Sequence, residues 1–163
     1  DLRAIGHIFY ESQRGAFETR AFKRASSLQI FEEVGTISQH TPELVHALLE
    51  RNGDPNFRDD DGTSCLLRAC FNARRSPDEW KLMVIRLLLE RMADPNASGG
   101  RTGAAPLHVV ARTAHVMAPS FWLLLTEHSA NPVQIDRAGR SAFDVVRDER
   151  NTFLTQSAMN FEP

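Results

Sequence analysis

Hydrophobic residues in the middle of the chain recur with the period of an α-helix. The spacing i, i+3, i+4, i+7 joins the apolar residues Ile85, Leu88, Leu89 and Met92. Val84 and Leu87 widen this stripe beyond one narrow face. A wide apolar stripe is expected for a helix that packs between two neighbours. The pattern therefore predicts a largely buried helix in this segment.

The same arrangement occurs three times along the chain. A leucine-rich segment that ends in Asp-Pro-Asn or Asn-Pro covers residues 47–56, 86–96 and 123–132. The Asp or Asn residues that anchor these segments, at positions 54, 94 and 131, are 40 and 37 residues apart. A second motif begins eight or nine residues after each anchor, at Gly62, Gly103 and Gly139. Two series in the same phase indicate an internal repeat.

Each repeat is predicted to be a helical hairpin whose second helix begins near a proline. Pro42, Pro77 and Pro119 stand at the expected starts of the second helices. A proline at the first helical position loses only an N–H that would have no partner there. Ser76 and Glu79 also have the spacing of a capping box, which predicts that Ser76 caps the second helix of the middle repeat.

These motifs resemble the ankyrin repeat, a unit of turn, helix, tight turn and helix. The first helix resembles the family's Gly-x-x-Pro-Leu-His motif at Gly103–His108, and the second resembles its Leu-Leu-x-x-x-Ala-Asp-x-Asn motif at Leu88–Asn96. The sequence departs from the family at Cys65, where Cys-Leu-Leu replaces Pro-Leu-His. It departs again at Met92 and Ser129, where the family usually has glycine. Two insertions between helices, around residues 73–80 and 115–119, are expected to lengthen the repeat.

The resemblance covers about residues 28–156 and implies an all-α solenoid of about four stacked helix-turn-helix units. The expected bounds of the units are approximately 28–58, 59–99, 100–135 and 136–156. The last unit is expected to have a shortened second helix near Phe153. Residues 1–27 match no repeat, and their apolar residues predict one or two helices that cap the stack, although docking of a partner by these helices stays open. Residues 157–163 are expected to form a C-terminal tail.

Composition and charge argue against two classes of function, nucleic-acid binding and membrane association. The chain has 163 residues, of which 42% are hydrophobic and 25% charged, as in a globular domain. Nineteen basic and 21 acidic residues give a net charge of −2. This balance argues against a strongly basic nucleic-acid binder. No apolar run reaches the ~18 residues of a membrane-spanning helix, so no membrane partner is expected.

Two further features bear on location. Cys65 and Cys70 cannot build a disulfide framework, and we expect both to be reduced thiols in the core. The first residues, Asp1 to Gly6, contain no signal-peptide pattern. The chain does not begin with Met. We therefore expect an intracellular segment of a longer protein, with cytoplasm and nucleus both open.

The sequence offers no arrangement typical of catalysis. Six histidines and two cysteines occur, but no Gly-x-Ser-x-Gly, His-Glu-x-x-His or phosphate-binding glycine loop. Residues 99–103 lack the Gly-Lys-Ser/Thr ending of a phosphate loop and are predicted to be a turn between repeats. The resemblance gives His108 a structural role in holding neighbouring backbone. We expect no enzyme activity, no cofactor and no metal.

The resemblance implies that a ligand binds at the inter-repeat finger tips and the inner faces of the first helices. Those positions in this chain are Asp60, Asp61, Thr63, Phe71, Asn72, Arg101, Thr102, Arg112, Thr113 and Arg137. Phe71 is a candidate anchor because it occupies a usually exposed position. We hypothesise that the acidic finger, residues 59–61, takes basic side chains of a ligand, and that Arg101, Arg112 and Arg137 take acidic ones.

The sequence thus predicts a protein-interaction module. We expect a monomeric adaptor or scaffold that holds an extended peptide or loop on its concave face. Rigid helices would pre-order the site and reduce the entropy lost on binding. Three alternatives stay open. The segment could be the targeting arm of a larger multidomain enzyme, such as a ubiquitin ligase or a signalling protein. It could bind nucleic acid through its arginines, which the charge balance disfavours, or it could be a structural spacer.

Overall fold

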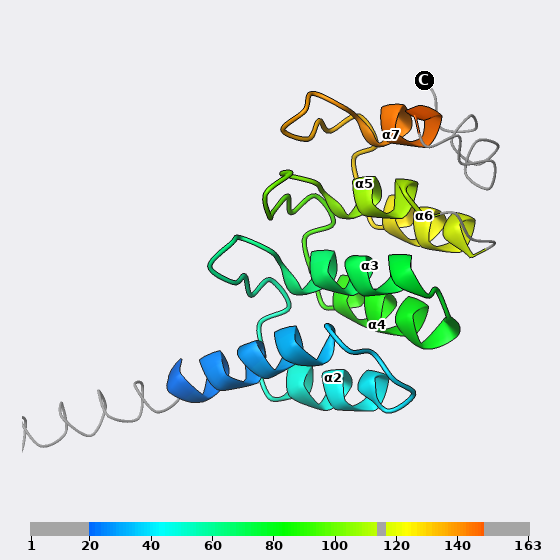
Figure 1. Ribbon diagram of the computed structural model, residues 1–163. Coiled ribbons are helices and arrows are strands. Elements are labelled where there is room, and N and C mark those ends of the chain that lie inside the picture. Colours follow the sequence, from blue (N-terminus) through cyan, green and yellow to red (C-terminus); the bar gives the residue numbers. More distant parts are fainter. Residues whose placement is uncertain (1–19, 114–116, 149–163) are drawn as a thin grey trace, which may run out of the picture.

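The computed structural model is a stack of helix pairs (Figure 1). The structure describes residues 20–113 and 117–148. Residues 20–33 are helical. The helices that follow are α2 (Thr41–Glu50), α3 (Cys65–Arg75), α4 (Glu79–Glu90), α5 (Pro106–Ala111), α6 (Ala118–Glu127) and α7 (Ala142–Asp148). The described part of the chain holds no β-strand, only two isolated bridges within loops, so the fold is all-α as predicted.

The helices form two layers. α3 packs against α4 and α5, and α5 packs in turn against α6 and α7. In the second layer α4 contacts both α2 and α6. Figure 1 shows that the loops between successive pairs project from one side of the stack. We call these loops the first finger (residues 58–64), the second finger (98–104) and the third finger (135–140).

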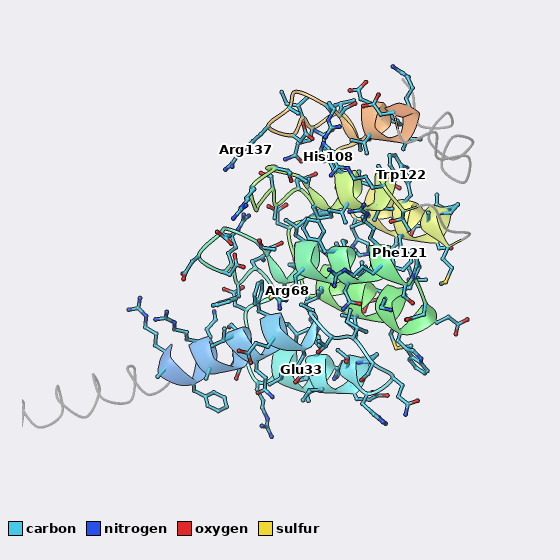
Figure 2. The ribbon with its side chains drawn as sticks, viewed as in Figure 1. Glu33, Arg68, His108, Phe121, Trp122 and Arg137 are labelled. Atoms are coloured by element: carbon cyan, nitrogen blue, oxygen red, sulfur yellow. The ribbon has the colours of Figure 1, made fainter. Side chains whose placement is uncertain are left out.

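Apolar side chains between the two layers form one continuous core. Its largest fully buried members in α6 are Phe121 and Trp122, which Figure 2 labels within the stack. The indole of Trp122 lies 5.8 Å from the ring of Phe143, centre to centre. Cys65 and Cys70 are buried in the same core and are not in a disulfide, as predicted. The described helices include none that is both long enough and apolar enough to cross a bilayer.

The helix starts agree with the proline pattern only in part. Pro42 and Pro119 lie in the first two positions of α2 and α6. The capping prediction for α4 is wrong, because Asp78 and not Ser76 is the residue before the helix. Oδ1 of Asp78 accepts a hydrogen bond from the backbone N–H of Lys81 at 2.9 Å. Lys81 also forms an ion pair with Oδ2 of Asp78 at 2.6 Å and donates to the carbonyl of Ser76.

A left-handed residue ends each of the three second helices. Asn52 and Met92 have φ of 63°, and Ser129 has φ of 67°. Met92 and Ser129 are the two positions at which the resemblance implies glycine, which adopts this backbone region at no steric cost. Met92 was also expected to continue the apolar stripe, and this expectation is wrong. α4 ends at Glu90, so Met92 lies in the turn and is 81% exposed.

The anchor residues of the sequence repeat organise the turns that follow. Oδ1 of Asp54 accepts the N–H of Asn56 at 2.9 Å, and Oδ1 of Asp94 accepts the N–H of Asn96 at 2.8 Å. Oδ1 of Asn131 makes the equivalent bond to the next residue but one, at 3.0 Å. The short polar side chain at each anchor therefore fixes the same local turn.

Two asparagines connect each turn to the next one along the stack. Asn56 donates to the carbonyl of Met92 at 2.8 Å and accepts from the N–H of Asp94 at 2.7 Å. Asn96 makes the same pair of bonds to Ser129 and Asn131, at 3.0 and 2.6 Å. We call these four bonds the asparagine ladder. The sequence repeat thus corresponds to a repeated pattern of hydrogen bonds.

The helix over residues 20–33 crosses the expected boundary between a cap ending at residue 27 and a repeat beginning at residue 28. Its later part enters the core through Ile30 and Phe31, whereas Phe22 is 55% exposed. The stretch around residues 73–80, expected to be an insertion between helices, mostly lengthens α3 to 11 residues, compared with six in α5. The expectations for residues 1–19, for the start of the insertion at 115–119, for Phe153 and for the tail at 157–163 fall outside the described residues.

Candidate functional site

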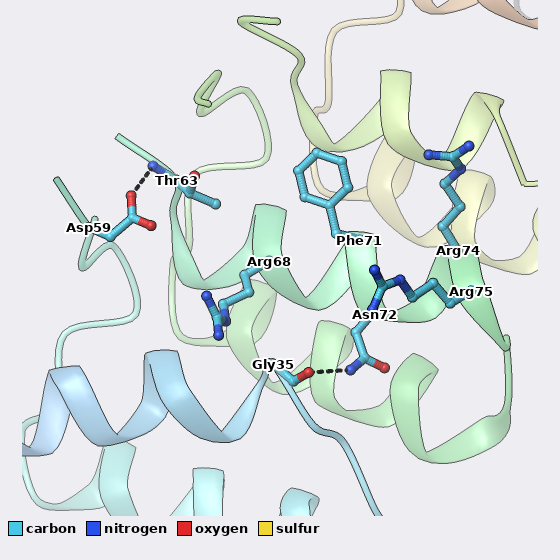
Figure 3. A pocket seen from close by; sticks show the side chains of 8 residues that line it. All are labelled: Gly35, Asp59, Thr63, Arg68, Phe71, Asn72, Arg74 and Arg75. Carbon is cyan, nitrogen blue, oxygen red and sulfur yellow. Dashed lines mark hydrogen bonds between the residues drawn. The ribbon is translucent and has the colours of Figure 1, made fainter. Parts of the chain in front are cut away.

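An open hollow lies on α3, between the first finger and the turn that follows residues 20–33. Its volume is about 650 Å³. Figure 3 shows the residues that line it, which are Gly35, Asp59, Thr63, Arg68, Phe71, Asn72, Arg74 and Arg75. We call this space the α3 hollow. It contains three of the predicted site residues, Thr63, Phe71 and Asn72.

One face of α3 supplies most of the lining. Arg68, Phe71, Asn72 and Arg75 have the spacing i, i+3, i+4, i+7, which places them on the same side of a helix. The opposite side of α3 carries buried residues and fixes the helix in the core. The helix start is also fixed, because Oγ of Ser64 accepts the backbone N–H of Leu67 at 3.2 Å. The site face is therefore presented by a rigid element.

Arg68 occupies the base of the hollow in a defined position. Its guanidinium carbon lies 4.4 Å from the centre of the Phe31 ring, a cation–π contact. On another side it lies against Gly35, where an added Cβ would be 2.6 Å from both Nε and Nη2. Only glycine leaves room for the guanidinium at this point.

Asn72 has a structural contact as well as a place in the hollow. Its Nδ2 donates to the carbonyl oxygen of Gly35 at 2.7 Å (Figure 3). This bond joins α3 to a turn 37 residues earlier in the chain. Asn72 therefore holds one wall of the hollow, in addition to its predicted place on the exposed face.

The residues of the acidic finger, 59–61, have two different roles. Oδ1 of Asp59 accepts the backbone N–H groups of Asp61 at 3.1 Å and Thr63 at 2.8 Å. These bonds shape the first finger and bring the carboxylate of Asp59 to the edge of the α3 hollow. Asp60 and Asp61 are exposed, as predicted, and lie outside the lining of this hollow.

A smaller hollow of about 340 Å³ lies between the fingers and is lined partly by Asp61 and Arg137. Arg137 projects from the third finger (Figure 2). Its Nη1 donates to the carbonyl of Arg101 at 2.9 Å, and its backbone N–H donates to Thr102 at 3.0 Å. Arg137 thus braces the second finger, while Arg101 and Thr102 are exposed at its tip.

Two predicted residues do not fit the site. Thr113 is only 4% exposed, and its hydroxyl donates to the carbonyl of Val109 at 3.4 Å. Its side chain is therefore buried rather than on the exposed face where the resemblance places it, and its hydroxyl is satisfied by the preceding turn. Arg112 is half-buried and does not line the α3 hollow or the finger hollow.

Sequence reasoning missed the three arginines of the α3 hollow. Arg74 and Arg75 fall in the stretch around residues 73–80 that the sequence marks as an insertion, and Arg68 directly follows the Cys-Leu-Leu motif at Cys65. The signal was present in the helical spacing, because Arg68 precedes Phe71 by three residues and Arg75 follows it by four.

The two buried thiols of the core have raised pKa values. Burial raises the pKa of the Cys70 thiol to about 12, and burial together with Asp54 raises that of Cys65 to about 12. Thiols with such values form little thiolate near neutral pH. No cluster of three His, Cys, Asp or Glu side chains in the described ranges could hold a metal ion.

The sequence matches no protein-family model, and a search of curated proteins finds no similar sequence. The function must therefore be inferred from the residues of the site.

Proposed function

We propose that this chain is an ankyrin-type repeat stack that binds an extended peptide or loop of another protein, as an adaptor or scaffold. The binding face consists of the fingers and the exposed sides of the first helices. The repeated turns at Asp54, Asp94 and Asn131 support the family assignment. So does His108, which bonds both its own helix start and the third finger.

The observation that carries the proposal is the α3 hollow with Phe71 at its edge. Phe71 is 38% exposed and has no apolar neighbour in the lining of the hollow. Exposed aromatic side chains that sit beside arginines on a rigid element are typical binding anchors. Because α3 is fixed by its core contacts, a ligand would bind with little ordering of the protein.

Site-specific photo-crosslinking in cell extract tests this proposal. A photoreactive phenylalanine analogue replaces Phe71 in one variant and Arg86 in a matched control. Arg86 is exposed on α4, in the other layer of the stack. We expect protein adducts from position 71, identified by mass spectrometry as one segment of one or a few partners, and none of these from position 86.

Two outcomes would contradict the proposal. Adducts with the same proteins from both positions would show nonspecific contact. A complete absence of protein adducts at position 71, with circular dichroism unchanged from the parent chain, would remove the α3 hollow as a protein-binding site and favour a spacer.

A further inference from the structure

The α3 hollow carries more positive than negative charge. Its ionisable lining residues are Arg68, Arg74, Arg75 and Asp59. One oxygen of Asp59 already accepts two backbone N–H groups of the first finger. Because three guanidinium groups share the hollow with one partly engaged carboxylate, the electrostatic potential there favours an anionic ligand.

Arg68 is positioned before any ligand binds. The Phe31 ring and the backbone of Gly35 hold its guanidinium on two sides. Its Nε is shielded from solvent and meets no hydrogen-bond partner among the residues that the structure describes. A shielded N–H without a partner costs free energy. A carboxylate beside the guanidinium would reduce that cost through charge-assisted hydrogen bonds.

The other two arginines are also available. Arg74 and Arg75 are exposed at the end of α3. Neither forms an ion pair with a carboxylate within residues 20–113 and 117–148. The planar fork of a guanidinium matches the two oxygens of a carboxylate. Figure 3 shows both side chains at the opposite end of the hollow from Asp59.

We propose that the α3 hollow binds an acidic segment of a partner protein, with carboxylates on Arg68, Arg74 and Arg75 and an apolar side chain on Phe71. This inference rests on the proposed peptide-binding function and adds the charge of the ligand. It also replaces the sequence hypothesis that Arg101, Arg112 and Arg137 receive the acidic side chains, because Arg137 braces the second finger.

A nucleic acid fits this surface less well than an acidic peptide. The first finger places the exposed side chains of Asp60 and Asp61 next to Asp59 at the edge of the hollow. A nucleic acid carries a charge at every phosphate and would meet these carboxylates as it crosses the face. A peptide can confine its carboxylates to the arginine end.

Selection from a random dodecapeptide display library identifies the ligand class directly. The parent chain is immobilised, and the retained peptides are sequenced and compared with the input library. We expect enrichment of Asp and Glu beside one apolar residue. Fluorescence anisotropy then measures the affinity of the selected peptides. The same peptides with Asp replaced by Asn and Glu by Gln test whether binding needs the carboxylates.

Three variants and a matched control locate the binding. Arg68→Gln, the double variant Arg74→Gln with Arg75→Gln, and Gly35→Ala, which displaces Arg68, should each weaken the selected peptides by about tenfold or more. Arg86→Gln removes an exposed arginine from α4 and should change affinity by less than about twofold. Circular dichroism verifies that each variant is folded, and a variant that unfolds is replaced by Arg68→Lys, which keeps the charge but loses the fork.

The outcomes separate this inference from the proposed function. Enrichment of neutral or basic peptides that lose affinity with Phe71→Ala would overturn the acidic ligand and leave peptide binding intact. Acidic peptides that bind the arginine variants as well as the parent would place the acidic site elsewhere. No enriched peptide at all would contradict both. A single-stranded oligonucleotide that binds the parent, and loses affinity with Arg68→Gln, would assign the hollow to nucleic acid.

Discussion

Nε2 of His108 lies 2.9 Å from the carbonyl oxygen of Arg140, a residue of the third finger. Nδ1 of the same ring accepts a hydrogen bond from the backbone N–H of Ala105 at 3.3 Å. Nε2 therefore carries the proton, and its N–H donates a hydrogen bond to the carbonyl oxygen of Arg140. One buried imidazole thus fixes the start of α5 and the position of the next finger.

Replacement of His108 should destabilise the stack. His108→Ala removes two hydrogen bonds. It leaves the buried N–H of Ala105 without its partner, and the carbonyl of Arg140 keeps only its bond from the N–H of Asp136. We therefore expect a loss of about 2 kcal/mol in the free energy of unfolding. Urea denaturation followed by circular dichroism measures this loss. His46→Ala, at an exposed position of α2, is the control and should have little effect. Equal stability of the two variants would refute the bridging role.

Replacement of Met92 by glycine should stabilise the protein. Met92 has a φ of 63°, where a Cβ is strained, and its side chain is 81% exposed, so little packing is lost. The relief of strain exceeds the extra chain entropy of glycine, and we expect a gain of about 0.5 to 1 kcal/mol. Met92→Ala keeps the Cβ and should show no such gain in the same denaturation experiment.

Asp136 should make stability depend on pH in the acid range. Burial alone would raise the pKa of this carboxyl, but hydrogen bonds from the N–H and guanidinium of Arg140 and from the N–H of Ala138 outweigh burial and lower the pKa below its ordinary 3.8. The charged form is therefore favoured in the folded chain. The charged carboxylate contributes its full stabilisation of the fold above the ordinary pKa. This contribution is lost as pH falls through the lower pKa that the carboxyl has in the folded chain.

Asp136→Asn tests this dependence. We expect the variant to lose about 2 kcal/mol near neutral pH, because the buried hydrogen bonds to a charged acceptor are weakened. Its free energy of unfolding should also change less than that of the parent between about pH 6 and about pH 3. Asp60→Asn, at an exposed position of the first finger, is the control. A parallel fall in parent and variant would show that other groups govern acid unfolding.

Gly53 should not tolerate the alanine that occupies the equivalent positions 93 and 130. A Cβ at Gly53 would lie 2.5 Å from Cδ1 of Ile30, in the helix over residues 20–33. We expect Gly53→Ala to cost about 1 to 3 kcal/mol by overpacking. Ile30→Val removes that methyl group, so the double variant should recover part of the loss, and a double-mutant cycle measures the coupling. Strict additivity would show that Ile30 is not the obstacle.

The repeat was predictable from the sequence because its signals are local. The anchors Asp54 and Asp94 each bond the residue two positions later, so their spacing alone reveals where the turns occur. Pro42 and Pro119 likewise act within one helical turn. Such contacts form between residues close in the sequence, so they can be predicted without knowledge of the tertiary structure.

The α3 hollow was not predictable in the same way. The position of Arg68 depends on Phe31 and Gly35, which are more than thirty residues earlier and belong to the preceding repeat. The error at Ser76 has a different, local origin, since Asp78 and Ser76 both satisfy the capping preference. The ion pair between Asp78 and Lys81 favours the later residue.

The asparagine ladder determines how the stack would respond to tension. Asn56 joins its turn only to the turn at Asp94, and Asn96 joins that turn only to the one at Asn131. Each bond of the ladder joins two successive turns, so a pull on the chain loads these bonds one pair after another and not all at once. The repeats should therefore separate one at a time, with each pair of ladder bonds resisting separately.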